Sequence, residues 1–157
     1  MKKVIVVGSG IAGLTAAFYV KRCGFDVTLI KPHSLFDEVY KLWQDTGDCG
    51  SLSMANRIAQ TFTDMGGKFI SKSKVKKVNI NDGKVTGVTL NNGVLEADAV
   101  IKEPGDRSKQ YPGDSEYVIG LDFAGHRLKT PEDLSGALIS GRQAAQLVCR
   151  QFDVVFR

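Results

Sequence analysis

The 157 residues are enough for one domain with a buried core. With 43% hydrophobic and 24% charged residues, the composition is that of a globular protein and excludes a disordered, collagen-like or coiled-coil chain. The net charge of +4 mildly favours an anionic ligand. Seventeen glycines beside only four prolines indicate turns and close backbone contacts rather than a flexible tract. We expect a single domain over residues 1–157.

The first thirty residues predict a strand, a helix and a second strand. Val4–Val7 is apolar and β-branched, which is typical of a strand buried on both faces. Ile11–Cys23 has helical spacing and is followed by Gly24, a frequent helix stop. Asp26–Ile30 is again mostly apolar and ends before Pro32. This order predicts a right-handed parallel crossover in an α/β fold.

The middle of the chain changes from helical to strand periodicity. We expect helices over 35–43 and 54–65, the second capped by Ser53. From residue 68 to 101 the spacing is that of strands, which predicts a small antiparallel β-meander. The last part of this stretch, 97–101, is expected to be a buried strand.

Turn and cap signals place the remaining boundaries. Asp82-Gly83 and Asn91-Asn92-Gly93 favour hairpin turns within the meander. Residues 117–124 form a further strand candidate. The final helix is expected to start after a Thr130 cap and to run to about Phe152.

Gly8, Gly10 and Gly13 match the pattern G-x-G-x-x-G between the first strand and the first helix. The first glycine permits a tight turn, the second lets a pyrophosphate approach the backbone, and the third lets helix and strand pack closely. The N–H groups at the start of the helix, around Ile11 and Ala12, can then bind the phosphates. A glycine-rich turn with no ligand is the alternative interpretation.

Beyond this motif the chain resembles the cofactor domain of FAD-dependent oxidoreductases of the flavin amine oxidase, phytoene desaturase and glycine oxidase type. The resemblance rests on three parts in the family's order: 4–30, 67–105 and a C-terminal flavin motif over 123–145. It implies a Rossmann-like parallel sheet with helices, FAD as cofactor, and oxidoreductase chemistry. It also implies that Val75 presents backbone groups to the adenine and that the start of the last helix, near Ala137, points at the flavin ring.

Three positions depart from that family's pattern, all at cofactor contacts. Where the family ends its second strand with an acid that holds the ribose, this chain has Lys31, whose ammonium donates hydrogen bonds but cannot accept them. The family's small Ala-Thr-Gly is replaced by Glu-Pro-Gly over 103–105, which retains Gly105. Gly125 is followed by His126 where the family has an acid. Lys31 suits a 2′-phosphate, so NADPH is the alternative cofactor.

The length is a further departure, because the family carries a substrate domain inserted in two places. Here only short segments, 34–52 and 106–116, stand at those places. We expect a cofactor domain with trimmed insertions that associates with a second copy or another chain. The alternative is a non-catalytic dinucleotide-binding or partner-binding module that kept the fold. No catalytic residue can be named.

The cysteines indicate a reducing compartment. Cys23, Cys49 and Cys149 are odd in number and contain no C-x-x-C pair, so we expect reduced thiols in a cytoplasmic protein. Cys23 is interpreted as a packing residue of the helix rather than a redox thiol.

Other ligand classes have weak support in the sequence. His33 and His126 are the only histidines, and their spacing does not suit zinc, so we expect no metal. The lysine run over 72–77 has no adjacent aromatic set to stack bases, which favours a solvated strand face over nucleic-acid binding. No apolar run is long enough for a signal peptide or a membrane span.

Overall fold

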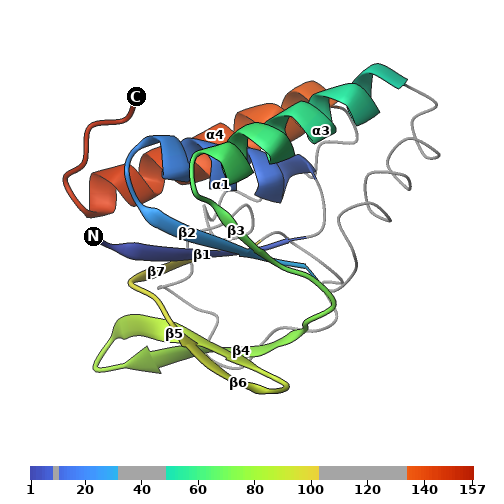
Figure 1. Ribbon diagram of the computed structural model, residues 1–157. Helices are drawn as coiled ribbons and strands as arrows, with labels where there is room; N and C mark the ends of the chain where they lie inside the picture. The colour runs from blue at the N-terminus through green and yellow to red at the C-terminus, as the bar shows by residue number, and fades with distance from the viewer. Residues whose placement is uncertain (9–10, 32–48, 103–133) are drawn as a thin grey trace.

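A four-stranded parallel sheet separates a layer of helices from a smaller antiparallel sheet (Figure 1). The computed structural model describes residues 1–8, 11–31, 49–102 and 134–157. The predicted α/β fold, a Rossmann-like parallel sheet with helices and a small antiparallel meander, is confirmed.

The parallel sheet consists of β1 (Lys3–Val7), β2 (Asp26–Ile30), β3 (Lys68–Ile70) and β7 (Ala99–Lys102). Its strand order is β3-β2-β1-β7, and every neighbouring pair is parallel. The apolar, β-branched runs predicted for the central strands are buried on both faces, because helices cover one face and the meander covers the other. The strand order therefore reverses at β1, with β2 and β3 on one side and β7 on the other.

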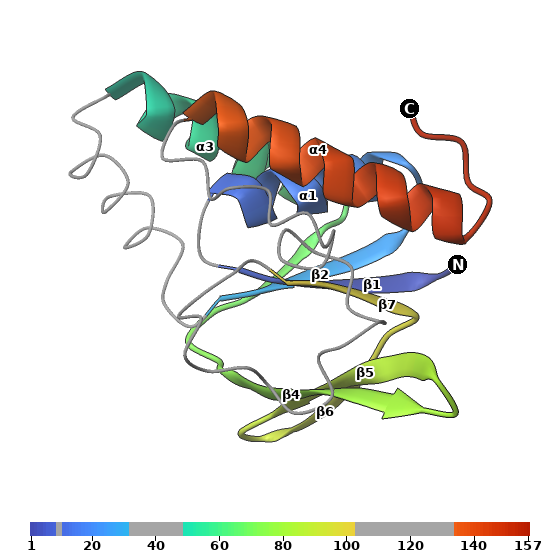
Figure 2. The same ribbon diagram turned by 180° about the vertical axis from the view of Figure 1, so that it is seen from behind.

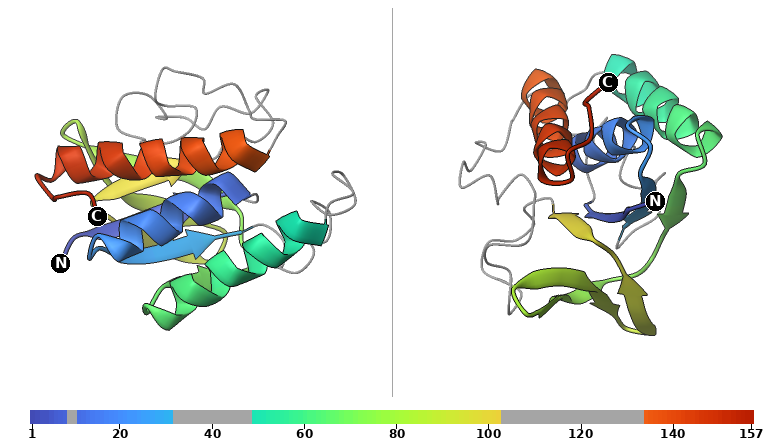
Figure 3. Two further views of the ribbon diagram at one scale, coloured as in Figure 1. Left: turned by 90° about the horizontal axis from the view of Figure 1, so that it is seen from above. Right: turned by 90° about the vertical axis from the view of Figure 1, so that its left-hand side faces the viewer.

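Three described helices, α1 (Ile11–Arg22), α3 (Cys49–Asp64) and α4 (Leu134–Gln151), cover the same face of the sheet. Figure 2 shows α4 along α1, and α1 lies between α3 and α4 in Figure 3. Small alanines on α1 and α4 allow this close packing. Together with strand side chains they form the main core, whose members include Val6, Ala16, Ala17, Val20, Val27, Leu29, Phe62, Ile101, Ala144, Ala145 and Val148.

The predicted meander is confirmed as β4 (Val75–Asn81), β5 (Lys84–Leu90) and β6 (Gly93–Glu96), paired in antiparallel order. Its first hairpin turn has positive φ at both central residues, 50° at Asp82 and 75° at Gly83, which is the twist that a two-residue hairpin favours. The inner face packs on the parallel sheet in a second core that includes Ile5, Ile30, Val75, Val78, Val88, Leu90 and Val100. The lysines over 72–77 are exposed, as predicted.

Two predicted boundaries need correction. The helix predicted to begin at Met54 begins at Cys49, so Ser53 lies inside it instead of capping it. The reason is that the small polar residues before Met54 carry no apolar period, although the chain is helical there.

The strand segment Phe69–Ile70 was expected within the meander, but it belongs to the parallel sheet as β3 beside β2. At the far end of the meander, the N–H of Ala97 still bonds to the carbonyl of Thr86 at 3.0 Å, while the N–H of Asp98 bonds to the carbonyl of Lys3 at 2.8 Å. The chain crosses from one sheet to the other between these two residues, so β7 begins later than predicted, at Ala99.

The predicted helix over 35–43, the predicted strand over 117–124 and the Thr130 cap lie outside the described residues. Within the described ranges, none of the helices combines the length and apolar character needed to cross a membrane.

Candidate functional site

The turn between β1 and α1 is the part of the site that the sequence predicted most directly. Gly8 is buried at the end of β1, and its N–H donates to the carbonyl of Ile30 at 3.2 Å, which holds the strand end against β2. Helix α1 begins at Ile11, and Ala12 and Gly13 in its first turn are buried. The first turn of an α-helix directs its N–H groups beyond the helix end, where they and the helix dipole favour an anion.

The site lies where the strand order of the parallel sheet reverses. Val7, the last residue of β1, is in register with Ile30 of β2 on one side and Lys102 of β7 on the other. In open α/β sheets, ligands bind outside the carboxyl ends of the strands at such a reversal. The first turn of α1 therefore stands at the position that topology assigns to a ligand.

Two lysines flank this position. Lys31 directly follows β2 and is 2% exposed; its N–H donates to the carbonyl of Ile70 at 2.8 Å, and its carbonyl accepts from the N–H of Ser73 at 3.1 Å. These bonds fix the backbone of Lys31 to the end of β3 and to the segment that follows. Lys102 is the last residue of β7 and is half-buried. The carboxyl edge of the sheet thus carries a lysine directly after β2 and another at the end of β7, the two strands that flank β1.

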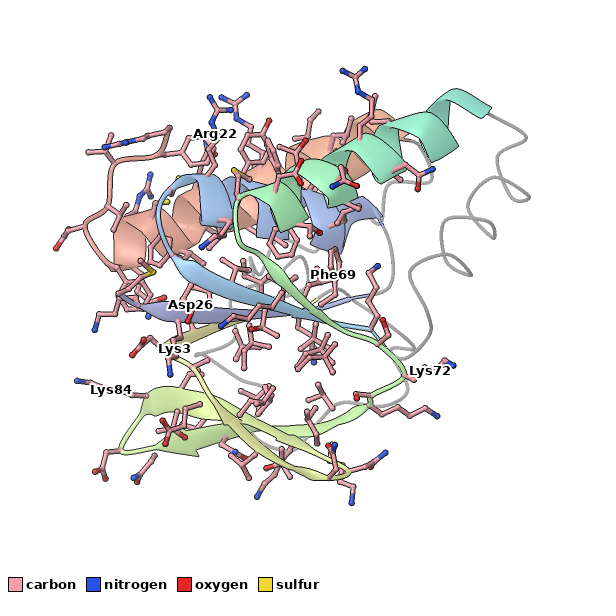
Figure 4. All side chains as sticks on the ribbon, in the orientation of Figure 1. Lys3, Arg22, Asp26, Phe69, Lys72 and Lys84 are labelled. Carbon is pink, nitrogen blue, oxygen red and sulfur yellow. The ribbon has the colours of Figure 1, made fainter. Side chains whose placement is uncertain are left out.

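Acidic side chains gather at the opposite edge. Asp26 opens β2, and the carboxylate of Asp98, just before β7, accepts from the N–H of Lys3 at 2.8 Å. Figure 4 shows Lys3 and Asp26 at this amino edge and Lys72 at the other edge. No aspartate or glutamate among the described residues belongs to the carboxyl edge, where Gly8, Lys31, Ser73 and Lys102 lie. The described part of that edge therefore suits a negatively charged ligand.

The predicted adenine contact, Val75, lies close to this edge. It is the first residue of β4, two residues after Ser73, whose N–H binds the carbonyl of Lys31. Its side chain is 5% exposed and packs in the core between the two sheets. The side chain therefore anchors the start of β4 in the core between the two sheets.

Helix α4 is positioned by its contact with α1. A Cβ added to Gly141 would lie 2.6 Å from the carbonyl oxygen of Ala12 and 2.8 Å from the backbone nitrogen of Ala16. Because Ala137 precedes Gly141 by about one helical turn, this contact places it at the same end of the molecule as the first turn of α1.

The structure thus brings together Gly8, Ala12, Gly13 and Lys31, with Ile11, Val75 and Ala137 at the same end of the fold. Gly10, Gly105, Gly125 and His126 lie outside the described residues. Sequence reasoning missed Lys102: its place directly after the predicted strand 97–101 was a local signal, but its position beside β1 follows from the pairing of β7 with β1. It also missed the role of Gly141 as a helix contact.

Comparisons with known proteins agree with this fold. The family model described as glucose inhibited division protein A matches residues 3–67, the stretch from β1 through α3. A search of curated proteins finds no significant match.

Several solved structures resemble the chain. Glycine oxidase from Bacillus cereus ATCC 14579 gives a TM-score of 0.53 at 13% identity, over 69% of this chain and 56% of that one. Thioredoxin reductase from T. acidophilum gives a TM-score of 0.53 at 21% identity, over 67% of this chain and 36% of that one. CtdE in complex with FAD gives a TM-score of 0.53 at 18% identity, over 67% of this chain and 38% of that one.

The chain therefore shares a fold with those proteins over about two thirds of its own length. At such identities the likenesses concern the fold alone. The chain spans about half the length of the glycine oxidase, 56%, and under two fifths of the other two, 36% and 38%.

Proposed function

We propose that this chain is an FAD-binding domain of the flavin-dependent oxidoreductase kind, with the dinucleotide at the carboxyl edge of the parallel sheet. One observation carries the proposal. The buried Gly8, the first turn of α1, and the lysines Lys31 and Lys102 converge where the strand order reverses. The solved structure of CtdE, which is similar in fold, is described as a complex with FAD, and this supports the choice of dinucleotide.

The residues present suit a dinucleotide. The backbone from Gly8 to Gly13 would hold the pyrophosphate, because glycines there allow close approach and the helix end favours negative charge. Lys31 and the backbone of Val75 would face the adenosine part, and the start of α4 around Ala137 would face the flavin ring. When bound, FAD supplies redox chemistry, and the role of this chain is to bind and orient it.

At a finer level, we propose a relation to the amine oxidase, phytoene desaturase and glycine oxidase type. The support is the order of the three sequence parts, 4–30, 67–105 and 123–145, together with the similar fold of a glycine oxidase. No two described residues at the site form an acid–base pair. Cytoplasmic localisation remains a proposal from the cysteine pattern alone.

NADPH is the second candidate ligand, and Lys31 is the observation that favours it. A cation at the end of β2 can meet a 2′-phosphate, whereas an acid there meets ribose hydroxyls. The side chain is 2% exposed, so a ligand group that reached it would displace the groups that now cover it. Comparing FAD with NADPH on the same protein separates the two candidates.

We also propose that a second copy or another chain covers the cofactor edge. Large apolar side chains are exposed on the two outer helices, Met54 at 37% on α3 and Ile139 at 57% on α4. Light scattering across a concentration series should show self-association. A strict monomer that captures no partner would contradict this part of the proposal.

The function is tested by purifying the protein, recording its visible spectrum, and titrating the apo-protein with FAD and NADPH. We expect FAD to bind more tightly than NADPH. Gly13→Leu should abolish binding, because the side chain would push α1 away from the sheet. Arg22→Leu, at the exposed far end of the same helix, is the matched control and should bind normally. A folded wild-type protein that binds neither dinucleotide would overturn the proposal.

A further inference from the structure

Helices α1 and α4 run side by side in the same direction (Figure 3). Gly141 of α4 lies against the first turns of α1, at Ala12 and Ala16. Cys149 follows Gly141 by two turns of α4, an advance of about 12 Å at 1.5 Å per residue. The same advance along α1 from Thr15, which also lies against Gly141, reaches Cys23, just beyond the last helical residue. Parallel packing therefore brings two cysteines that are far apart in the sequence to the same level.

The two thiols are in contact at this level. Cys149 is 1% exposed in the main core, and the half-buried Cys23 packs against that core. Burial raises the pKa of the Cys149 thiol from 9.0 to about 12, and a side-chain hydrogen bond with Cys23 and the charge of Cys23 contribute further. Both cysteines are reduced in the structure.

The neighbouring rings hold this end of the fold together. Phe152 directly follows α4, and Phe25 directly precedes β2. The centroids of their rings lie 6.0 Å apart. The N–H of Val154 bonds back to the carbonyl of Cys149 at 2.8 Å. The ring contact thus joins the two segments that carry the thiols, and the backbone bond holds the chain after α4 against Cys149.

We propose that Cys23 and Cys149 form a dithiol that a low-molecular-weight disulfide oxidises to a disulfide bond between the ends of α1 and α4. The more accessible Cys23 attacks the small disulfide as a thiolate, which forms a mixed disulfide and releases one small thiolate. Cys149, as a thiolate, then attacks Sγ of Cys23, which forms the Cys23–Cys149 bond and releases the second small thiolate. Two electrons pass from the protein pair to the small disulfide, and its two thiolates take up the two protons.

The high pKa of Cys149 makes the second step the slow one, because only the thiolate attacks. The finished bond would close a loop that contains β2, α3, the meander and β7. Closing a long loop restricts the unfolded chain and so favours the folded state.

The test uses the reduced full chain carrying Cys49→Ala, so that only the proposed pair can react. Incubation with oxidised glutathione should remove both free thiols, lower the mass by two hydrogen atoms, and give a peptide linking Cys23 to Cys149. The Tm of the oxidised protein should rise by roughly 5–15 °C and return on reduction.

Two variants in the same background separate the steps. Cys149→Ser should stop at the glutathione adduct on Cys23, and Cys23→Ser should form no internal bond. Thermal melts of both reduced variants show whether they are folded. The proposal is overturned if the folded two-cysteine protein keeps a stable glutathione adduct on Cys23, forms only intermolecular disulfides, or does not react while unfolded protein does.

Discussion

Gly141 lies so close to Ala12 that a single added Cβ would stand 2.6 Å from the carbonyl oxygen of Ala12. This distance is too short for carbon and oxygen, and backbone atoms cannot move aside as a flexible side chain can. The contact fixes α4 to the first turn of α1. Because that turn is the proposed phosphate-binding element, packing at Gly141 and binding at Gly8–Gly13 should be linked.

Gly141→Ala should therefore destabilise the protein, although alanine normally stabilises a helix relative to glycine. We expect the free energy of unfolding to fall by about 1–3 kcal/mol from overpacking, together with weaker FAD binding. Urea denaturation and an FAD titration measure the two effects. Gln143→Ala, exposed on the same helix, should change stability by less than about 0.5 kcal/mol. A stabilised Gly141→Ala protein would show that the two helices are not in this contact.

Gly87→Ala should weaken the meander. Gly87 has a φ of +153° in β5, and a Cβ there would meet the backbone of Leu95 and Glu96 in the neighbouring strand. We expect a loss of about 1–3 kcal/mol in the free energy of unfolding, measured by chemical denaturation. Thr86→Ala, an exposed neighbour in the same strand, is the control. Equal stability of the two variants would contradict the described pairing of β5 with β6.

Lys31→Glu should strengthen FAD binding and weaken NADPH binding. A carboxylate can accept from both ribose hydroxyls, and charge-assisted bonds of about 1.5–3 kcal/mol correspond to roughly tenfold to hundredfold in affinity. Lys31→Met keeps the apolar stem without the charge, so it should weaken NADPH binding and leave FAD binding unchanged. Titrations are paired with thermal melts because the site is buried. If the Lys31→Glu protein binds FAD no more tightly and NADPH no less tightly than the wild-type protein does, Lys31 does not face the ribose.

The raised pKa of Cys149 predicts a loss of stability at alkaline pH. In the unfolded chain the thiol ionises near 9.0, whereas in the folded protein it ionises at about 12. As the pH rises through this interval the unfolded state holds fewer protons, so the free energy of unfolding falls. Cys149→Ala lacks this contribution, and its stability should decline less steeply. Denaturation of both reduced proteins at about pH 8 and about pH 10 measures the difference; parallel declines would contradict it.

Local sequence patterns predicted the first part of the fold closely. β1, α1 and β2 were found because their apolar residues follow strand and helix periods and the glycines mark the turns between them. The start of α3 was missed because Gly50, Ser51 and Ser53 have weak helix preference and carry no apolar period. β3 was assigned to the wrong sheet because a three-residue strand carries no signal of its partner.

In the candidate site too, local patterns placed some residues and missed those that depend on long-range packing. Gly8 and Lys31 could be placed because each directly follows a strand with a clear period, and Gly13 because it lies in the first turn of α1. The contribution of Lys102 depends on β7 pairing with β1, and the contact of Cys23 with Cys149 depends on the packing of two distant helices. Such long-range relationships follow from tertiary packing, which no local pattern encodes.

The most direct test of the central claim is a titration of the ¹⁵N-labelled apo-protein with FAD, followed by backbone amide NMR. The proposed site predicts saturable shifts at Gly8, Ala12, Gly13, Lys31 and Lys102. Amides at the opposite end of the fold, such as Gly24 and Lys84, should stay unchanged. Saturable binding confined to those five positions would support the carboxyl edge as the dinucleotide site. Absence of binding by the folded protein, or shifts that leave Gly8–Gly13 unaffected, would contradict it.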